Sequence, residues 1–171
     1  MTLTIQQADL SDIDIVHEFF NSFFRLKLEG LSFRPDGMTV DKTRTYLPNT
    51  ITDSNKLCLT AHWDLEVAGV LSFTRYKKFE YRHCGDFGMA IMPEFWRRGI
   101  GSQLLLTMEK WCLANDITKI ELAAWSNNIA AINLYESFGF QHEGKRVGSI
   151  IRDEKTMDLI LMGKQIGGDF S

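Results

Sequence analysis

The chain has 171 residues, of which 44% are apolar and 24% are charged. This length and composition suffice for one well-buried domain, so we expect residues 1–171 to form a single domain. The net charge of −3 argues against a nucleic-acid-binding protein, which needs a basic face, and fits a cationic small substrate better. No apolar run reaches transmembrane length and the N-terminus lacks a signal-peptide pattern, which predicts a cytoplasmic protein without membrane contact.

Neither the cysteines nor the histidines form a pattern typical of a metal or nucleophile site. The three cysteines are odd in number, lack CxxC spacing and lie in apolar or strand-like runs, which indicates reduced core residues: Cys58, Cys84 and Cys112. The four histidines fall in different predicted elements: His17, His62, His83 and His142. No serine or cysteine stands in a nucleophile-elbow context. We therefore expect no metal and no covalent acyl-enzyme.

The first third of the chain predicts a strand, a helix and a loop-rich region. Leu3 and Ile5 alternate with polar residues as in a strand, and Ser11 is the expected N-cap of an amphipathic helix. The apolar stripe of that helix is typical of core packing, and part of it can line an acceptor cavity: Ile13, Val16, Phe19, Phe20, Phe23 and Phe24. Residues Glu29–Asn55 contain two glycines and two prolines, so we expect loops and one short helix near Thr39–Tyr46.

A β-hairpin follows, and after it a segment rich in basic and aromatic residues. Lys56–Trp63 and Val67–Tyr76 favour strands and are separated by a short loop, which predicts that they pair. Arg75–His83 is too short to be a nucleic-acid patch in an acidic chain. We interpret it as a solvated strand end and loop, with contact to cofactor phosphates or to an acidic substrate group as the alternative.

The central stretch joins a buried strand to an amphipathic helix. Phe87–Met92 is an apolar run that Pro93 ends, because proline cannot donate to a sheet ladder. From Ile100 onward, apolar residues recur with a period of about 3.6 residues, which predicts a helix. The residues of this stripe are Leu104, Leu105, Met108, Trp111 and Cys112.

The turn between this strand and helix has the composition of an anion-binding site. It reads Arg97-Arg98-Gly99-Ile100-Gly101-Ser102. Glycines let a ligand approach the backbone, so the free N–H groups of the first helical turn can surround an anion, and arginines add charge and paired donors. This suits a pyrophosphate, and hence a nucleotide-bearing cofactor. The spacing matches neither a P-loop nor a dinucleotide-binding fingerprint. An ordinary turn with solvated arginines is the alternative.

The last third predicts strands and one capped helix. Lys119–Trp125 is a strand, and Ser126-Asn127-Asn128 supplies capping side chains for a helix over Ala131–Phe138 that Gly139 ends. Two more strands are expected on either side of a turn at Arg152-Asp153-Glu154, over the ranges Gln141–Ile151 and Lys155–Lys164.

Two motifs stand in order in the second half of the chain. Trp96–Gly101 reads Trp-Arg-Arg-Gly-Ile-Gly between a strand and a helix, and residues 128–140 read Asn-x-x-Ala-Ile-x-Leu-Tyr-x-x-x-Gly-Phe. Together they resemble the GNAT superfamily of acyl-CoA-dependent N-acetyltransferases, whose cofactor motif is Gln/Arg-x-x-Gly-x-Gly/Ala. Both glycine positions match, and Trp96 stands at the Gln/Arg position. The second family motif is matched at Asn128, Ala131, Ile132, Leu134, Tyr135, Gly139 and Phe140. The resemblance covers about Val67–Lys164.

The resemblance implies a fold, a reaction and a cofactor site. The fold is expected to be a single α/β domain of the α+β type, with a mixed, mostly antiparallel seven-stranded sheet and about four helices, in which Phe87–Met92 and Lys119–Trp125 are parallel. The reaction is direct transfer of acetyl from acetyl-CoA to the primary amine of a small molecule, an amino acid or a peptide N-terminus. The implied cofactor residues are Met89, Ala90, Ile91, Arg97, Arg98, Gly99, Ile100, Gly101, Ser102, Asn128 and Tyr135.

The implied reaction needs a neutral amine. Deprotonating a lysine-like amine at pH 7 costs roughly 4 to 5 kcal/mol, so a nearby carboxylate helps. Asp86, just before the cofactor strand, is the first candidate for this base and Glu80 the second; Asp86 merely ending a strand is the alternative. The resemblance implies that Tyr135 protonates the leaving thiolate, with plain packing as the alternative. A backbone N–H near Met89–Ile91 can stabilise the oxyanion if the strand splays from its neighbour.

Several questions stay open at the level of the sequence. In the resembled family the region corresponding to Glu29–Asn55 covers the acceptor, so Glu29, Asp36 and Asp41 are candidate amine-binding acids, with solvated loop charges as the alternative. A non-catalytic acyl-CoA-binding sensor on the same fold is the alternative to an enzyme. A homodimer is left open as the assembly state, and the sequence does not define the acceptor.

Overall fold

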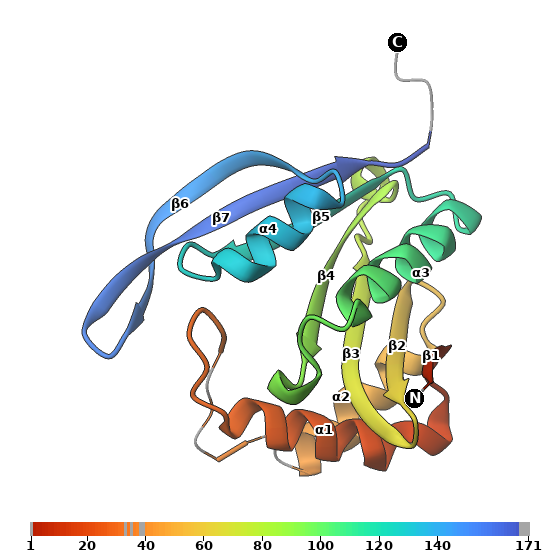
Figure 1. The fold of residues 1–171 in the computed structure, drawn as a ribbon. Coiled ribbons are helices and arrows are strands. Elements are labelled where there is room, and N and C mark those ends of the chain that lie inside the picture. The colour runs from red at the N-terminus through yellow and green to blue at the C-terminus, as the bar shows by residue number, and fades with distance from the viewer. Residues whose placement is uncertain (1, 33, 35, 38–39, 168–171) are drawn as a thin grey trace.

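The computed structural model describes residues 2–32, 34, 36–37 and 40–167, except for the side chains of residues 40–44. In this part of the chain the strands form one seven-stranded sheet in the order β1-β2-β3-β4-β5-β7-β6 (Figure 1). Neighbouring strands are antiparallel except β4 and β5, which are parallel, so the predicted mixed sheet is confirmed. The strands are β1 (Leu3–Gln7), β2 (Lys56–Trp63), β3 (Glu66–Arg75), β4 (Cys84–Ile91), β5 (Lys119–Trp125), β6 (Gln141–Arg152) and β7 (Lys155–Gln165).

Helices cover both faces of the sheet, and each face has its own apolar core. The helices are α1 (Ile13–Arg25), α2 (Val40–Thr52), α3 (Ile100–Ala114) and α4 (Ile129–Ser137), with short 3-10 helices at Leu10–Asp12, Phe79–Tyr81 and Pro93–Phe95. One core joins the buried faces of α3 and α4 to the sheet, through Leu104, Leu105, Met108, Leu71 and Phe73 among others. The other joins α1 and α2 to the opposite face, through Phe19, Phe23, Leu47, Cys58 and Val70 among others. The sheet is thus the middle of three layers.

The two parallel strands separate after only three paired positions. β4 pairs with β5 from Cys84↔Lys119 to Asp86↔Glu121, whereas it stays paired with β3 as far as Ile91. β5 likewise stays paired with β7 as far as Trp125. Beyond Asp86 and Glu121, therefore, the facing edges of β4 and β5 have no ladder bonds with each other, and the two strands diverge (Figure 1). Such a divergence is the condition for the oxyanion site expected from the sequence, and it positions the candidate active site.

The start of α1 differs from the prediction, because Ser11 is not its N-cap. The Asp9 carboxylate accepts a hydrogen bond from the Ser11 N–H at 2.6 Å and caps the short helix Leu10–Asp12, which leads directly into α1. Asp12 closes a capping box by accepting from the Asp9 N–H at 2.9 Å. A carboxylate two residues earlier therefore takes the capping position that the sequence assigned to the serine.

α2 is longer than predicted and continues through Pro48 to Thr52. Leu47 is fully buried against α1 and the sheet, and the hydroxyls of Thr50 and Thr52 donate to the carbonyls of Tyr46 and Pro48 at 2.9 and 2.8 Å. Tertiary burial of an apolar side chain offsets the helix-breaking tendency of an internal proline here. Thr39, where this helix was expected to begin, lies outside the described residues.

The second half of the chain follows the prediction. Asn128 caps α4 by accepting from the Ala131 N–H at 3.2 Å, and Gly139 takes a positive φ of 90° just after the helix. β6 and β7 form a hairpin around Asp153 and Glu154. The three cysteines are buried and unbridged, as expected. Among the residues that the structure describes, none of the helices is long and apolar enough to cross a membrane.

Candidate active site

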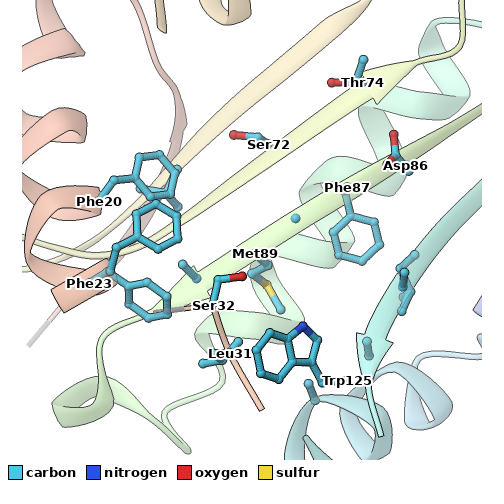
Figure 2. Close-up of a pocket in the computed structure, with 18 of the residues that line it drawn as sticks. Phe20, Phe23, Leu31, Ser32, Ser72, Thr74, Asp86, Phe87, Met89 and Trp125 are labelled. Atoms are coloured by element: carbon cyan, nitrogen blue, oxygen red, sulfur yellow. The ribbon is translucent and has the colours of Figure 1, made fainter. Parts of the chain in front are cut away.

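A cavity of about 1140 Å³ lies at the divergence of β4 and β5 (Figure 2). Side chains from α1, α2 and the loop between them line it on one face of the sheet, and side chains from α4 line it on the other. β3, β4 and β5 contribute the residues between these walls. Groups on both faces of the sheet therefore reach one shared space, in which two ligands approaching from opposite faces can meet.

The sheet face toward α1 presents small and polar side chains to this cavity. Alternate residues of a strand point the same way, so Asp86, Gly88 and Ala90 share that face. Their partners across the β3–β4 ladder are Thr74, Ser72 and Val70, and all six line the cavity. The Ser72 hydroxyl oxygen is buried and lies beside the Cys58 thiol on the neighbouring strand.

Asp86 is the carboxylate of this cavity. Its side chain is open to the cavity rather than enclosed in packing. Partial withdrawal from solvent raises the pKa of the Asp86 carboxyl above its ordinary value, the negative charge of the neighbouring Glu121 adds to the rise, and a hydrogen bond to its own backbone N–H offsets part of it. A carboxylate whose pKa is raised holds a proton more strongly, which is the property a general base for an ammonium group needs.

Glu121 is a nearby carboxylate that the sequence analysis did not select. It stands beside Asp86 at the last paired position of β4 and β5. The Tyr76 hydroxyl donates to Glu121 at 2.9 Å, and the Lys119 ammonium lies 3.2 Å from it. These bonds hold Glu121 in place, and its charge acts on Asp86 across the strand pair. No local motif marks Glu121, and only the register of two strands far apart in sequence could have revealed it.

Tyr135 reaches the cavity from α4, on the opposite face of the sheet. Its ring is 8% exposed and packs edge-to-face on Phe87, with 5.7 Å between ring centroids. Burial raises the pKa of the Tyr135 hydroxyl to about 12, so the phenol stays neutral at physiological pH. No hydrogen bond joins this hydroxyl to another described residue, so its proton is available to a ligand. With this pKa it acts as a hydrogen-bond donor more readily than as a full acid.

Met89, Ala90 and Ile91 lie on β4 beyond the last pair with β5. On the β5 side of this stretch the alternate backbone N–H and C=O groups have no strand partner, and Met89 and Ala90 line the cavity. Backbone donors left unpaired at a cavity are suited to a carbonyl oxygen that gains negative charge. The condition stated for the oxyanion site, divergence of this strand from its neighbour, is met.

The glycine turn lies just beyond this end of the cavity. Gly99 has φ +79° and precedes α3, and a side chain at this position would meet nothing within 4 Å. The N–H groups of Ile100, Gly101 and Ser102, in the first turn of α3, have no partner within the helix. A side chain at Gly101 would lie 2.8 Å from Leu134, so this glycine also allows close packing of α3 against α4. An open turn with free N–H groups fits a phosphate group.

The two arginines of the turn have different surroundings. The Arg98 guanidinium lies over the rings of Trp63 and Phe95, 4.9 and 5.6 Å from their centroids. Arg97 has a positive φ of 59° and makes no hydrogen bond or ion pair with another described residue. Arg97 therefore has no described partner that a phosphate would have to displace, whereas the exposed Arg98 guanidinium lies against aromatic rings.

Trp96, at the Gln/Arg position of the motif, has a structural contact of its own. Its indole N–H donates to the Ile91 carbonyl at 2.8 Å, which satisfies a carbonyl at the end of β4. Trp96 thus links the glycine turn to β4, the strand that lines the cavity.

Asn128 connects α4 to the loop that covers the cavity. Besides capping the helix, its side-chain amide donates to the Gly30 carbonyl at 3.3 Å, and both residues line the cavity. Gly30 has φ +72°, and a side chain there would lie 2.6 Å from the Asn128 Cβ. A close approach of the loop to α4 therefore requires glycine at this position.

The structure does not bring three of the candidate acids to the cavity, and it does not describe the side chain of a fourth. Glu80 is exposed on the 3-10 helix Phe79–Tyr81, and neither it nor Glu29 or Asp36 is among the residues that line the cavity. Glu80 follows the end of β3 rather than the diverging part of β4, which explains the separation. The Asp41 side chain lies outside the described part of the chain.

Comparisons with known proteins show which family this chain resembles. The sequence profile of the Acetyltransferase (GNAT) family matches residues 15–140. The L-amino acid N-acetyltransferase AaaT of Escherichia coli is 29% identical over 109 residues, which are 62% of this chain and 66% of that protein; the match thus spans just under two thirds of that relative.

Two solved structures share the fold over nearly their whole length. An acetyltransferase of the GNAT family from Streptococcus pneumoniae has a TM-score of 0.87 and 30% identity, covering 97% of this chain and 100% of that one. A putative acetyltransferase from Salmonella typhimurium, solved with acetyl-CoA, has a TM-score of 0.82 and 20% identity, covering 100% of this chain and 98% of that one. With a family profile that spans most of its length, this chain belongs to the acetyltransferase (GNAT) family.

Proposed function

We propose that the protein is an acetyl-CoA-dependent N-acetyltransferase that acetylates the primary amine of a small molecule, an amino acid or a peptide N-terminus. One observation carries the proposal: a carboxylate, Asp86, and a neutral phenol, Tyr135, reach one cavity from opposite faces of the sheet, at the point where β4 and β5 diverge. The named function of the Escherichia coli relative supports an amine acceptor, and the Salmonella structure supports acetyl-CoA as co-substrate.

The residues at the start of α3 fit the pyrophosphate of such a co-substrate. The N–H groups of Ile100, Gly101 and Ser102, the open turn at Gly99 and the Arg97 guanidinium would hold it. The unpaired edge of Met89–Ile91 would bind the amide-containing arm, and Asn128 would keep the start of α4 in place. Acetyl-CoA supplies the acetyl group as a thioester.

In the proposed mechanism, Asp86 acts first by accepting a proton from the acceptor ammonium group. The neutral nitrogen then attacks the acetyl carbonyl, so that a C–N bond forms and the C–S bond breaks. A backbone N–H of Met89–Ile91 stabilises the negative charge that develops on the carbonyl oxygen. The Tyr135 hydroxyl donates a hydrogen bond to the departing thiolate, and the second proton of the amine leaves to solvent. No step requires a covalent bond to the protein.

A thiol-release assay across a panel of amines tests this proposal, together with calorimetry of acetyl-CoA binding. We expect binding, and release of free CoA that depends on both the amine and active protein. Tight binding without turnover on any amine would instead support a non-catalytic acyl-CoA sensor. No binding would contradict both functions.

A further inference from the structure

The floor of the acceptor side of the cavity contains a hollow at Gly88. A side chain at Gly88 would have no neighbour within 4 Å, although the residue lies in the middle of β4 and pairs directly with Ser72. The flanking positions on the same face are Ala90, on β4, and Val70, on β3. Small residues therefore leave room above the centre of the sheet, a few ångströms from Asp86 along one strand.

Apolar rings surround this hollow. The phenylalanines of α1 differ in burial: Phe19 and Phe23 are buried, whereas Phe20 and Phe24 are only half-buried. The rings of Phe20 and Phe24 stack on each other, with 5.6 Å between centroids and 14° between planes. Phe20, Phe23 and Phe24 line the cavity. Figure 2 shows Phe20 and Phe23 on one side of the cavity, Trp125 and Leu31 on another, and Asp86 and Thr74 toward a separate end. Half-exposed rings facing a concave space are typical of a binding wall for an apolar group.

The charges at the cavity oppose a second positive charge on the ligand. Asp86 is the one carboxylate among the described residues that line it, whereas two cationic side chains do so. The Arg34 guanidinium lies over Phe24 at 4.6 Å, and the Lys56 ammonium lies over Tyr46 at 5.8 Å. One ammonium group can approach Asp86, and a second one on the same ligand would meet an apolar or cationic wall.

From these features we infer that the acceptor is a primary amine with a single positive charge and a large apolar side chain, which can be aromatic. The Gly88 hollow and the rings of α1 bind this side chain. The inference rests on the proposed function and names the substrate class of the same site. A second prediction follows from it: a side chain added at Gly88 should remove the room for the large group while leaving room for a small amine.

The first test compares amines that differ in one group. With acetyl-CoA saturating, kcat/KM is measured for 2-phenylethylamine and ethylamine, for L-phenylalanine and L-alanine, and for 1,4-diaminobutane. Burial of a phenyl ring should raise kcat/KM at least about 10-fold within each pair, and the diamine should be the poorest substrate. Ethylamine, L-alanine or the diamine being preferred would overturn the inference and leave the proposed function intact, whereas no turnover of any amine would count against the proposed function itself.

The second test places a side chain in the hollow. Gly88→Val should lower kcat/KM for 2-phenylethylamine about 10-fold or more and change that for ethylamine by less than about threefold. Gly144→Val is the matched control, because Gly144 also lies in a strand and an added side chain there would make only an ordinary contact, 3.8 Å from Leu161. Equal losses for both amines in Gly88→Val would refute the hollow as the side-chain site. The wild-type comparison decides the question independently if this variant does not fold.

Discussion

At the scale of single residues, replacing Asp86 should distinguish an effect on catalysis from an effect on stability most clearly. Because its pKa is raised in the folded protein, stability is lost as the pH rises from the ordinary aspartate pKa through the raised one, and ionised Asp86 therefore lowers stability at pH 7. Asp86→Asn should therefore leave the free energy of unfolding at pH 7 unchanged or slightly increased. Turnover should fall about 100-fold, the usual size of a general-base contribution.

The pH profile gives a further check on Asp86. A base works only when deprotonated, so kcat/KM should fall as the pH drops through the raised pKa of Asp86, above the range of an ordinary aspartate. Asp86→Asn should lack this acid limb. An unchanged profile in the variant would assign the limb to another group.

Tyr135→Phe removes one hydroxyl and keeps the ring that packs on Phe87. Stability and acetyl-CoA affinity should change little, while kcat should fall about 10-fold, the low end of proton-donor effects, because a hydroxyl with a pKa of about 12 gives up its proton reluctantly. Equal kcat in the variant and the wild type, under conditions where the chemical step limits the rate, would limit Tyr135 to packing.

Replacing each of the two arginines of the glycine turn should likewise separate an effect on acetyl-CoA binding from an effect on stability. Arg97→Ala should weaken acetyl-CoA binding, and raised salt should weaken binding to the wild type more than to the variant. Arg98→Ala should instead lower the free energy of unfolding by about 1 kcal/mol, through loss of its contacts with Trp63 and Phe95. Calorimetry and chemical denaturation measure the two effects. The opposite assignment would follow if Arg98→Ala alone weakened binding.

At the scale of elements, the β6–β7 hairpin holds the loop that covers the cavity. The Arg152 guanidinium donates to the carbonyls of Leu28 and Leu31 at 2.6 and 2.8 Å, and Lys27 forms an ion pair with Asp153 at 2.9 Å. Leu31 and the adjacent Gly30 line the cavity. The hairpin thus supports the loop residues that line this part of the cavity.

Loss of this support should affect the amine more than the co-substrate. Arg152→Ala should raise KM for the amine about 3- to 10-fold, as expected from loss of charge-assisted hydrogen bonds, with acetyl-CoA affinity unchanged. Arg146→Ala, on an exposed stretch of the same hairpin, is the control. A matching loss of acetyl-CoA affinity in Arg152→Ala would indicate general unfolding of the hairpin rather than release of the loop.

The elements that the sequence predicted well are those with a strong local signal. The stripe from Ile100 to Cys112 and the capping side chain of Asn128 defined α3 and α4, because periodicity and caps act within a few residues. The extension of α2 through Pro48 could not be predicted, since it depends on burial of Leu47 against distant elements. The Asp9 cap was missed because a neighbouring serine offered the same chemistry.

At the scale of the whole molecule, the family and the mixed sheet followed from two motifs, but the cavity did not. Asp86 was selected for its place before the cofactor strand, whereas its neighbour Glu121 is set by the register of β4 and β5, which no local pattern reveals. The Glu80 carboxylate was an equally suitable candidate base by its chemistry, but it lies outside the cavity, on the 3-10 helix Phe79–Tyr81. The divergence of two strands, rather than the presence of an acid, decides which carboxylate lines the cavity.

The most direct test of the account is the stoichiometry of transfer by wild-type protein and Asp86→Asn. With acetyl-CoA and 2-phenylethylamine, the CoA thiol released is measured by a thiol reagent and the N-acetylated amine by mass spectrometry. We expect one acetylated amine for each thiol released, with both rates reduced together in Asp86→Asn. Thiol release without an acetylated amine, or equal rates of product formation in the two proteins, would contradict the proposal that Asp86 prepares an amine for acetyl transfer in this cavity.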